Sequence, residues 1–478
     1  MKGAEPMVDA RYLLDDNMMR DFIVNGYYII KPEHPKALHE TIYEKTKAVI
    51  EEYGNPGNNL LPRIPEIQKI YDHPAVVGAL TSILGPTYVM HAHRHPHVNA
   101  PQSRGGGWHK DSYWGYRKVR DHHPRWIMAM YYPQDTPIEI GPTGIIPGSQ
   151  YFETRVDSLD IDPQGRSLDP EGIGLPGCGE AGTVIIIHFD LYHRAFPNQT
   201  DQQRYMMKFQ FTRMDEPAKP HWNNQRGNIA LNGLSNHPRA TQWANMWDWL
   251  AGDKYIVSSD FASESTENLA GDLKDESEEK RMHAAYTLAT RGEEALPFLI
   301  DALQDEKDEV KREAGYGLAA LGPVALPRLL KLLNHEHDLV RGYAVYAMGD
   351  MGRAASSSVG KLILLIDDPS PVVRQNVSDA LGQIKNDPEA AVGALIKMMK
   401  DEDVQVRYNT AYALGKFGAD GQAAIPVLAD AFYDENRYVQ GHAAIALEQI
   451  GTPEALQVLL HQLQAVRWCP ETTKKSTF

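Results

Sequence analysis

Four residues of this sequence have types and a spacing that can perform metal chemistry: His109, Asp111, His193 and Arg204. One residue separates His109 from Asp111, so their side chains share a face on an extended strand. With His193 they supply two imidazoles and a carboxylate. This set can bind Fe(II) on one side of an octahedron and leaves three positions open for a cosubstrate and dioxygen. Arg204 follows His193 by eleven residues and offers a planar, permanently charged guanidinium to the far carboxylate of a 2-oxo acid.

Each of these residues also has an ordinary interpretation, because a single histidine or arginine is more often structural and surface ion pairs are common. The order of all four favours the metal site. His188 competes with His193 as the distal ligand, since it lies five residues earlier beside an apolar strand. His193 is preferred because it precedes the Pro197-Asn198 turn and lies eleven residues before Arg204.

Further histidines precede this motif. His91, His93, His95 and His97 alternate and would share one face of a strand. A second metal site there lacks carboxylate or thiolate partners. We therefore expect the strand to line the cavity beside the iron, with His95 and His97 as candidate substrate contacts and Asn99 as a candidate cosubstrate contact. We expect His122 and His123 at the surface.

Other candidates flank the same motifs. Residues 205–212 alternate between apolar and polar, which places Lys208 on the face of Arg204, either as a second anion contact or as a solvated lysine. Tyr113 and Trp114 are expected to shape the mouth of the site and contact substrate. A tryptophan cluster at positions 243, 247 and 249 is expected to pack in the core or against the C-terminal half.

The C-terminal half is a repeat. Val-Lys, Val-Arg or Val-Gln pairs begin at Val310, Val340, Val373, Val406 and Val439, at intervals of 30, 33, 33 and 33 residues. Twelve residues after each valine comes a position that ends a helix, glycine in four repeats and Lys385 in the other. Apolar helices and acidic turns lie between these marks. The pattern predicts an all-α solenoid of two-helix repeats and resembles short HEAT repeats.

The N-terminal half has a different pattern, with short β-rich runs, glycines and prolines. Helices are expected over residues 13–25 and 35–53 around a strand at 27–30, and a long loop over 157–182. We assign residues 1–257 to one domain, 258–275 to a linker rich in Ser, Glu and Asp, 276–466 to the repeats and 467–478 to a tail.

Composition excludes several classes of function. The net charge of -15 argues against nucleic-acid and anionic-membrane partners, and no apolar run is long enough to span a bilayer. The N-terminus lacks the apolar core of a signal peptide. The only two cysteines, Cys178 and Cys469, are expected to be free thiols. These features predict a cytoplasmic protein.

Several segments of the N-terminal half are similar to the phytanoyl-CoA dioxygenase (PhyH) family. They are residues 22–30, 108–111, 141–150 and 193–204. The third resembles a Gly-Pro … Pro-Gly-Ser-His signature, with Gln150 where histidine is usual. The resemblance implies a double-stranded β-helix, or jelly roll, flanked by helices and fused to the all-α solenoid.

The resemblance also implies a function. The chain is expected to be an Fe(II)- and 2-oxoglutarate-dependent dioxygenase that uses O2, releases succinate and CO2, and hydroxylates or otherwise oxidises a small-molecule C–H bond. His109, Asp111 and His193 would bind the iron, and Arg204 the 2-oxoglutarate. The retained Asp111 argues against a halogenase. As an alternative, the repeats bind a protein substrate or partner on their concave surface, or they pack over the jelly roll and stabilise it.

Overall fold

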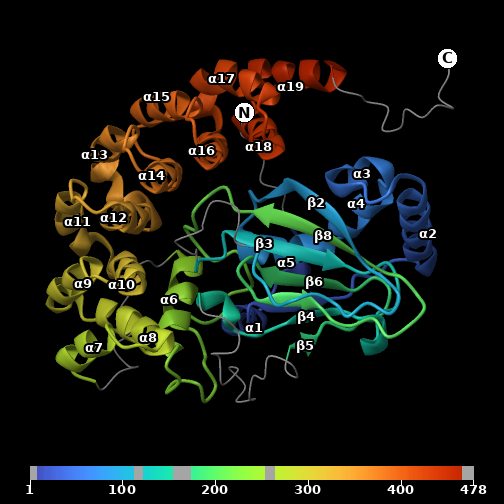
Figure 1. Ribbon diagram of the computed structural model, residues 1–478, viewed down its shortest axis with the longest axis horizontal. Coiled ribbons are helices and arrows are strands. Elements are labelled where there is room, and N and C mark those ends of the chain that lie inside the picture. The colour runs from blue at the N-terminus through green and yellow to red at the C-terminus, as the bar shows by residue number, and fades with distance from the viewer. Residues whose placement is uncertain (1–7, 112–121, 154–173, 253–263, 466–478) are drawn as a thin grey trace.

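In the computed structural model, the described residues are 8–111, 122–153, 174–252 and 264–465. The N-terminal half contains two antiparallel sheets, consistent with the expected jelly roll (Figure 1). The larger sheet has the strand order β1 (Tyr27–Ile30), β6 (Val184–His188), β3 (Trp126–Tyr131), β8 (Arg204–Thr212) and β2 (Val89–Asn99). The smaller has the order β5 (Leu175–Pro176), β4 (Thr143–Ile145) and β7 (His193–Ala195).

The core lies around the central strands of the larger sheet. Every residue of β3, β6 and β8 is buried, which explains the nearly continuous apolar sequences of β3 and β6, whereas β8 alternates apolar residues with polar ones that are also buried. Helices cover this half, and they are α1 (Asp16–Asn25), α2 (Lys36–Tyr53), α3 (Leu60–Arg63), α4 (Glu66–Tyr71), α5 (Pro74–Leu84) and α6 (Ala240–Ala251). The two expected N-terminal helices and the strand between them are confirmed as α1, β1 and α2.

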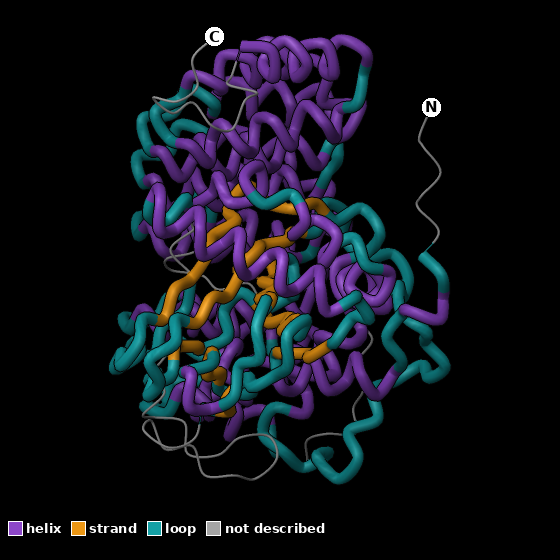
Figure 2. Tube along the Cα trace, turned by 90° about the vertical axis from the view of Figure 1, so that its right-hand side faces the viewer, coloured by secondary structure: helices purple, strands orange, loops and turns teal. Residues whose placement is uncertain are grey.

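The C-terminal half is a curved stack of helix pairs, which confirms the all-α repeats (Figures 1 and 2). Its helices are α7 (Thr266–Asp272), α8 (Glu278–Ala289), α9 (Leu296–Leu303), α10 (Asp308–Leu321), α11 (Leu326–Leu332), α12 (Asp338–Asp350), α13 (Val359–Leu362), α14 (Pro371–Ile384), α15 (Pro388–Met398), α16 (Val404–Lys416), α17 (Ile425–Asp430), α18 (Arg437–Ile450) and α19 (Pro453–Ala465). Helix α7 lies inside the segment expected to be a linker, so the helical region begins about ten residues earlier than the sequence suggested.

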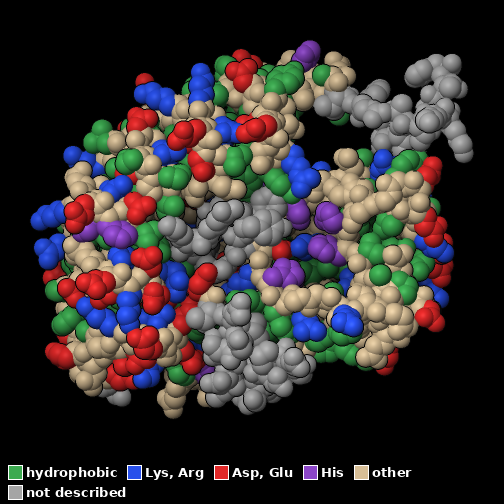
Figure 3. Space-filling model, viewed as in Figure 1, with side chains coloured by type: hydrophobic (Ala, Val, Ile, Leu, Met, Phe, Trp, Pro, Cys, Tyr) green, Lys and Arg blue, Asp and Glu red, His purple; other side chains and the backbone are tan. Residues whose placement is uncertain are grey.

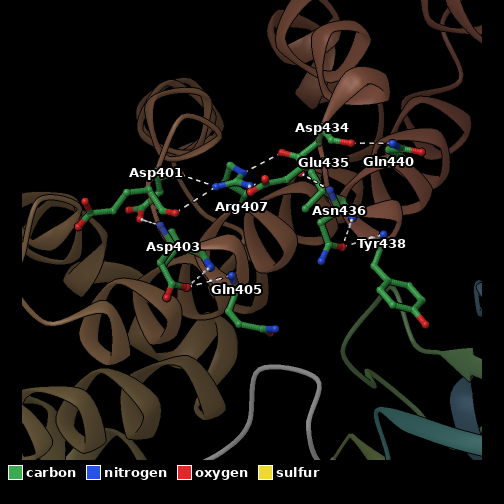
Figure 4. Close-up of polar contacts among 12 residues, drawn as sticks. Asp401, Asp403, Gln405, Arg407, Asp434, Glu435, Asn436, Tyr438 and Gln440 are labelled. Carbon is green, nitrogen blue, oxygen red and sulfur yellow. Dashed lines mark hydrogen bonds and ion pairs between the residues drawn. The ribbon is translucent and has the colours of Figure 1, made fainter.

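A ladder of arginines joins successive repeats. Arg341, Arg374 and Arg407 each form a two-pronged ion pair with an aspartate 27 residues later, with Nε–Oδ2 distances of 2.7–2.8 Å. One remaining nitrogen of each arginine binds a carbonyl of the preceding turn. In the last rung Gln440 replaces arginine and only binds the carbonyl of Asp434, at 2.6 Å (Figure 4). The Val-Arg motif is therefore the connection between repeats.

The inner helices of the repeats pack on the N-terminal half (Figure 1). Strand β2 meets α18, where His91 Nε2 lies 2.8 Å from His442 Nε2 and His93 Nδ1 lies 2.9 Å from the Tyr438 hydroxyl. A Cβ atom on Gly441 would lie 2.7 Å from Ala92 Cβ, so glycine permits this close approach. The concave face, which could have taken a protein partner, therefore covers the chain's own N-terminal half.

The prediction that His122 and His123 lie at the surface is wrong. Both are buried between the halves. His122 Nδ1 lies 2.7 Å from the Tyr286 hydroxyl, and His123 Nδ1 lies 2.8 Å from Asp350 Oδ1. The Trp249 ring stacks on His123, so this tryptophan packs at the interface. The short-range sequence pattern carries no signal for burial by a partner element more than 150 residues away.

Candidate metal centre

The two sheets bring His109, Asp111 and His193 together. His109 and His193 form an isolated antiparallel bridge, with N–O distances of 3.1 and 3.0 Å between their backbones. This pairing places the two imidazoles side by side, with ring centroids 4.4 Å apart. One donor atom from each of the three residues lies within 4.8 Å of the others. Among the described residues, this is the one group of three or more such side chains close enough to hold a metal ion.

Backbone carbonyls orient both imidazoles. Nδ1 of His109 lies 2.9 Å from the Gly107 carbonyl, and Nδ1 of His193 lies 3.0 Å from the Leu191 carbonyl. Because a carbonyl only accepts, both Nδ1 atoms carry the proton and both Nε2 lone pairs remain available. Nε2 of His193 is buried without a hydrogen-bond partner. Burial lowers the pKa of His193 to about 4, which keeps it in the neutral form that binds metals.

Asp111 is held ionised in a buried site. Burial opposes ionisation of its carboxyl group, but the nearby charge of Lys208 holds the pKa well below its usual range. Lys208 Nζ lies 2.5 Å from Asp111 Oδ2, and both side chains are buried. Lys208 is therefore not the solvated lysine that the sequence left open. Its partner in this structure is the candidate ligand itself.

Arg204 lies at the start of β8, opposite Asn99 in the register with β2. Its Nε donates to the Gly141 carbonyl at 3.0 Å, and its Nη1 is buried without a partner. Asn99 Nδ2 donates to the Gly141 and Phe196 carbonyls at 3.0 and 2.9 Å. The guanidinium is thus fixed at one edge and free at another, while Asn99 mainly braces the loops around it.

These residues fit the iron and 2-oxoglutarate that the resemblance implies. Two imidazoles and one carboxylate match the donor set of a mononuclear Fe(II) site. The orphaned Nε2 of His193 and Nη1 of Arg204 are buried polar atoms that a bound group would satisfy. The fit therefore rests on the donors and on two unsatisfied atoms, one at each end of the site.

The other predicted site residues divide into three groups. His95 lies opposite Lys208 and His97 opposite Met206 in the β2–β8 register, so both are on the face of the candidate ligands. The preceding histidines, at 91 and 93, turn instead to the repeats across an irregularity in β2 between Met90 and Arg94. Tyr113 and Trp114 lie outside the described residues. His188 is buried but does not join the ligand group.

Lys110 is a residue of this site that the sequence analysis did not single out. Its Nζ donates to the Ser149 and Phe152 carbonyls and lies 4.7 Å from the centre of the Tyr192 ring. Ser149 Oγ in turn accepts from the Tyr192 backbone N–H at 2.9 Å. Lys110 and Ser149 thereby tie the segment before His193 to the motif around Asp111. The sequence contains a signal for this role, because Lys110 lies between two candidate ligands of an extended segment and its side chain must therefore point away from them.

Residues 43–206 match the model of the phytanoyl-CoA dioxygenase (PhyH) family. The PhyH match spans all four residues with which the sequence argument began. Residues 266–468 match HEAT repeats in overlapping segments. The PhyH match and the donor set place the N-terminal region among Fe(II)/2-oxoglutarate-dependent oxidoreductases.

Solved structures similar to the chain include non-heme oxygenases. One is a non-heme monooxygenase, the ThoJ–Ni complex, with 16% identity and a TM-score of 0.33, covering 44% of this chain and 88% of that one. Another is the α-ketoglutarate-dependent carbocyclase SnoK from nogalamycin biosynthesis, with 18% identity and a TM-score of 0.32, covering 42% and 85%. No curated protein sequence matches the chain. None of the described helices is both long and apolar enough to cross a membrane.

Proposed function

We propose that this protein is an Fe(II)- and 2-oxoglutarate-dependent dioxygenase that oxidises a C–H bond of a small molecule and releases succinate and CO2. The observation that carries the proposal is the buried Arg204, with an unsatisfied Nη1, beside a convergent group of two imidazoles and a carboxylate. The bound metal would supply the activation of dioxygen that this chemistry requires.

The chain's own residues would bind and orient the reactants. His109, Asp111 and His193 would occupy one side of the metal. Arg204 would bind the distal carboxylate of 2-oxoglutarate through its free edge, because a guanidinium can present two parallel N–H donors to a carboxylate. Lys208 would hold Asp111 Oδ2, which leaves Oδ1 as the atom nearer to His109. Strand β8, which carries Arg204 and Lys208 and is buried along its whole length, would keep water from this side of the metal.

Anaerobic titration tests this proposal directly. The full-length protein with Fe(II) and 2-oxoglutarate should show the visible charge-transfer band of a chelated 2-oxo acid, and under air it should convert 2-oxoglutarate to succinate. His193→Gln should abolish the band and the succinate. The matched control is His461→Gln, an exposed histidine on α19, which should behave as wild type. If the wild-type protein binds neither iron nor 2-oxoglutarate, the proposal fails.

We propose that substrate reaches the iron along the inner face of β2. Histidine side chains gather around a hollow in the N-terminal half, near the middle of the view, with Lys and Arg side chains close by (Figure 3). His95 and His97 lie on this face, and burial lowers the pKa of both imidazoles. Both imidazoles are therefore neutral at physiological pH, and as neutral hydrogen-bonding groups they are suited to a polar group of the substrate. His97→Ala should raise KM for substrate while 2-oxoglutarate binding stays unchanged.

We propose that the repeats act mainly as a scaffold for the oxygenase half. Their concave helices contribute Tyr286, Asp350, Tyr412 and His442 to buried hydrogen bonds with that half. A protein partner would have to displace these contacts to use the concave face. Hydrogen exchange of the full chain should show α12 and α18 as protected as β3. Rapid exchange of both helices with a protected β3 would instead favour the protein-binding alternative.

A further inference from the structure

A second cavity lies between the two halves, apart from the metal centre. It has a volume of about 660 Å³ and is lined by the loop of residues 213–219, by residues 85–87 and by the ends of repeat helices near 351–354 and 382–385. Pockets of about 300–1,000 Å³ bind small molecules in many proteins. None of the four metal-site residues lines this cavity. Arg204 and the cavity residue Arg213 stand at opposite ends of β8, roughly 30 Å of strand apart.

Arg213 is the most unusual residue of this cavity. Its side chain is 2% exposed, and its hydrogen bonds go to the Ile83 and Asp215 carbonyls, while Nε has no partner. It forms no ion pair with any residue that the structure describes. Burial lowers its pKa to about 10. A buried guanidinium normally has an anionic partner, because desolvating an unpaired charge is costly. Gly85 lets the guanidinium lie close to the chain, since a Cβ atom at this position would lie only 3.1 Å from Nη1.

Three more cations come from both halves. Lys219 of the N-terminal half and Arg353 of the repeats line the cavity, are exposed, and have no ion pair within the described part of the chain. Lys385 lines it too, and its Nζ lies 2.8 Å from Asp215 Oδ1. The other acidic group of the lining, Glu216, pairs with Arg125 at 2.8 Å. The cations therefore exceed the anions available to them.

The backbone conformation of Lys385 is a second observation that supports a cationic lining of this cavity. It occupies the helix-ending position that is glycine in the other four repeats, and like those glycines it has a positive φ, of 50°. A residue with a Cβ atom rarely takes this conformation, which glycine adopts without cost. The strained position is thus filled by a cation directed to the cavity.

We propose that this cavity is a binding site for a small, multiply charged anion with carboxylate or phosphate groups, which joins the oxygenase half to the repeats. The free edge of Arg213 would bind the anion at the base, and Lys219 and Arg353 would close on it from opposite walls. The site is separate from the metal centre and does not depend on the proposed oxygenase activity.

Calorimetric titration of the full-length, metal-free protein tests this proposal. Pyrophosphate and citrate serve as the phosphate and carboxylate probes, and metal is removed because both chelate it. The variants are Lys219→Ala and Arg353→Ala, both at exposed positions that should not disturb folding. Arg328→Ala is the control, an exposed repeat arginine outside the cavity.

We expect wild-type protein to bind at least one probe with one-to-one stoichiometry, and the preferred probe identifies the chemistry of the natural ligand. Lys219→Ala and Arg353→Ala should each raise Kd by about tenfold, the loss of one charge-assisted hydrogen bond, and Arg328→Ala should not. The probe should also raise the Tm of wild type more than that of these variants. Absence of binding to wild type, an affinity in both cavity variants equal to that of wild type, or a loss in Arg328→Ala as large as theirs would each overturn the proposal.

Discussion

The arginines that connect the repeats differ in what they bind from the two arginines at the ends of β8. In the repeats, Arg341, Arg374 and Arg407 each have an aspartate partner 27 residues later and a backbone carbonyl for a further nitrogen. On β8 and directly after it, Arg204 and Arg213 bind only carbonyls and keep an unsatisfied buried nitrogen. The side chain is the same, and the presence of a carboxylate partner separates the two groups.

In this chain, an arginine with a carboxylate partner stabilises the fold, whereas a buried arginine without one lies at a candidate ligand site. The paired arginines of the repeats connect one repeat to the next, and the paired Arg125 connects the two halves. An unpaired one lies where chain elements leave a space, at the metal centre or in the cavity between the halves. Paired arginines should therefore affect the stability of the fold when altered, and unpaired ones should affect ligand affinity.

The largest effect is expected at the paired arginine between the halves. Arg125 Nη1 lies 2.8 Å from Asp350 Oδ1, which also binds His123. Asp350→Asn leaves a buried guanidinium without this partner, so the free energy of unfolding should fall by about 3 kcal/mol. Urea denaturation measures it, with Asp420→Asn, at an exposed position, as the control. A loss no larger than that of the control would contradict the assignment of paired arginines to architecture.

The second effect is expected at Arg204. Arg204→Met should weaken 2-oxoglutarate binding by about a hundredfold or more, because the distal carboxylate would lose a buried charged partner. The unfolding free energy should change much less, since no carboxylate of the protein is left unpaired. Binding is measured by titrating 2-oxoglutarate into the Mn(II)-loaded protein. Arg374→Met, at an arginine paired with a carboxylate, is the control. If it weakened 2-oxoglutarate binding as much as Arg204→Met does, the proposed difference between paired and unpaired arginines would be wrong.

The sequence predicted those parts of the molecule that local patterns encode. The repeat period, the helix-ending positions and the triplet around His109 depend on spacing within one segment, and the structure contains all of them. The approach of His193 to His109 also followed, because the order of motifs matched that of a known family. The left-handed backbone of Lys385 was implied by its position among four glycines.

The sequence could not predict which partner each polar residue would meet. His91 and His95 belong to one alternating run, yet His91 binds a repeat helix and His95 lies by the candidate ligands. The register irregularity of β2 separates them, and alternation alone gives no sign of it. His122 and His123 were misplaced for a similar reason, since their partners lie 164 and 227 residues away. Contacts of this kind depend on how two halves dock.

A smaller effect is expected inside the repeats. Arg374→Met removes the ion pair with Asp401 and a carbonyl hydrogen bond, so the unfolding free energy should fall by about 2 kcal/mol. Arg374→Lys should recover part of it, because a lysine keeps the charge but loses the two-pronged geometry. Denaturation curves of the three proteins give this order. If lysine were no better than methionine, the charge of the ladder would contribute nothing measurable.

The smallest effect is expected from pH, at the histidines that join the halves without a carboxylate. Burial lowers the pKa of His442 to about 4, whereas in the unfolded chain it should be near 6.5. The unfolded state therefore takes up the proton first as pH falls, and stability decreases between pH 6.5 and 4. Between pH 7.5 and 6 this histidine should account for a loss of about 0.8 kcal/mol. His442→Gln should flatten the measured dependence by that amount. An unchanged slope would mean that folding does not lower the pKa of His442, which would contradict its burial in a contact between neutral rings.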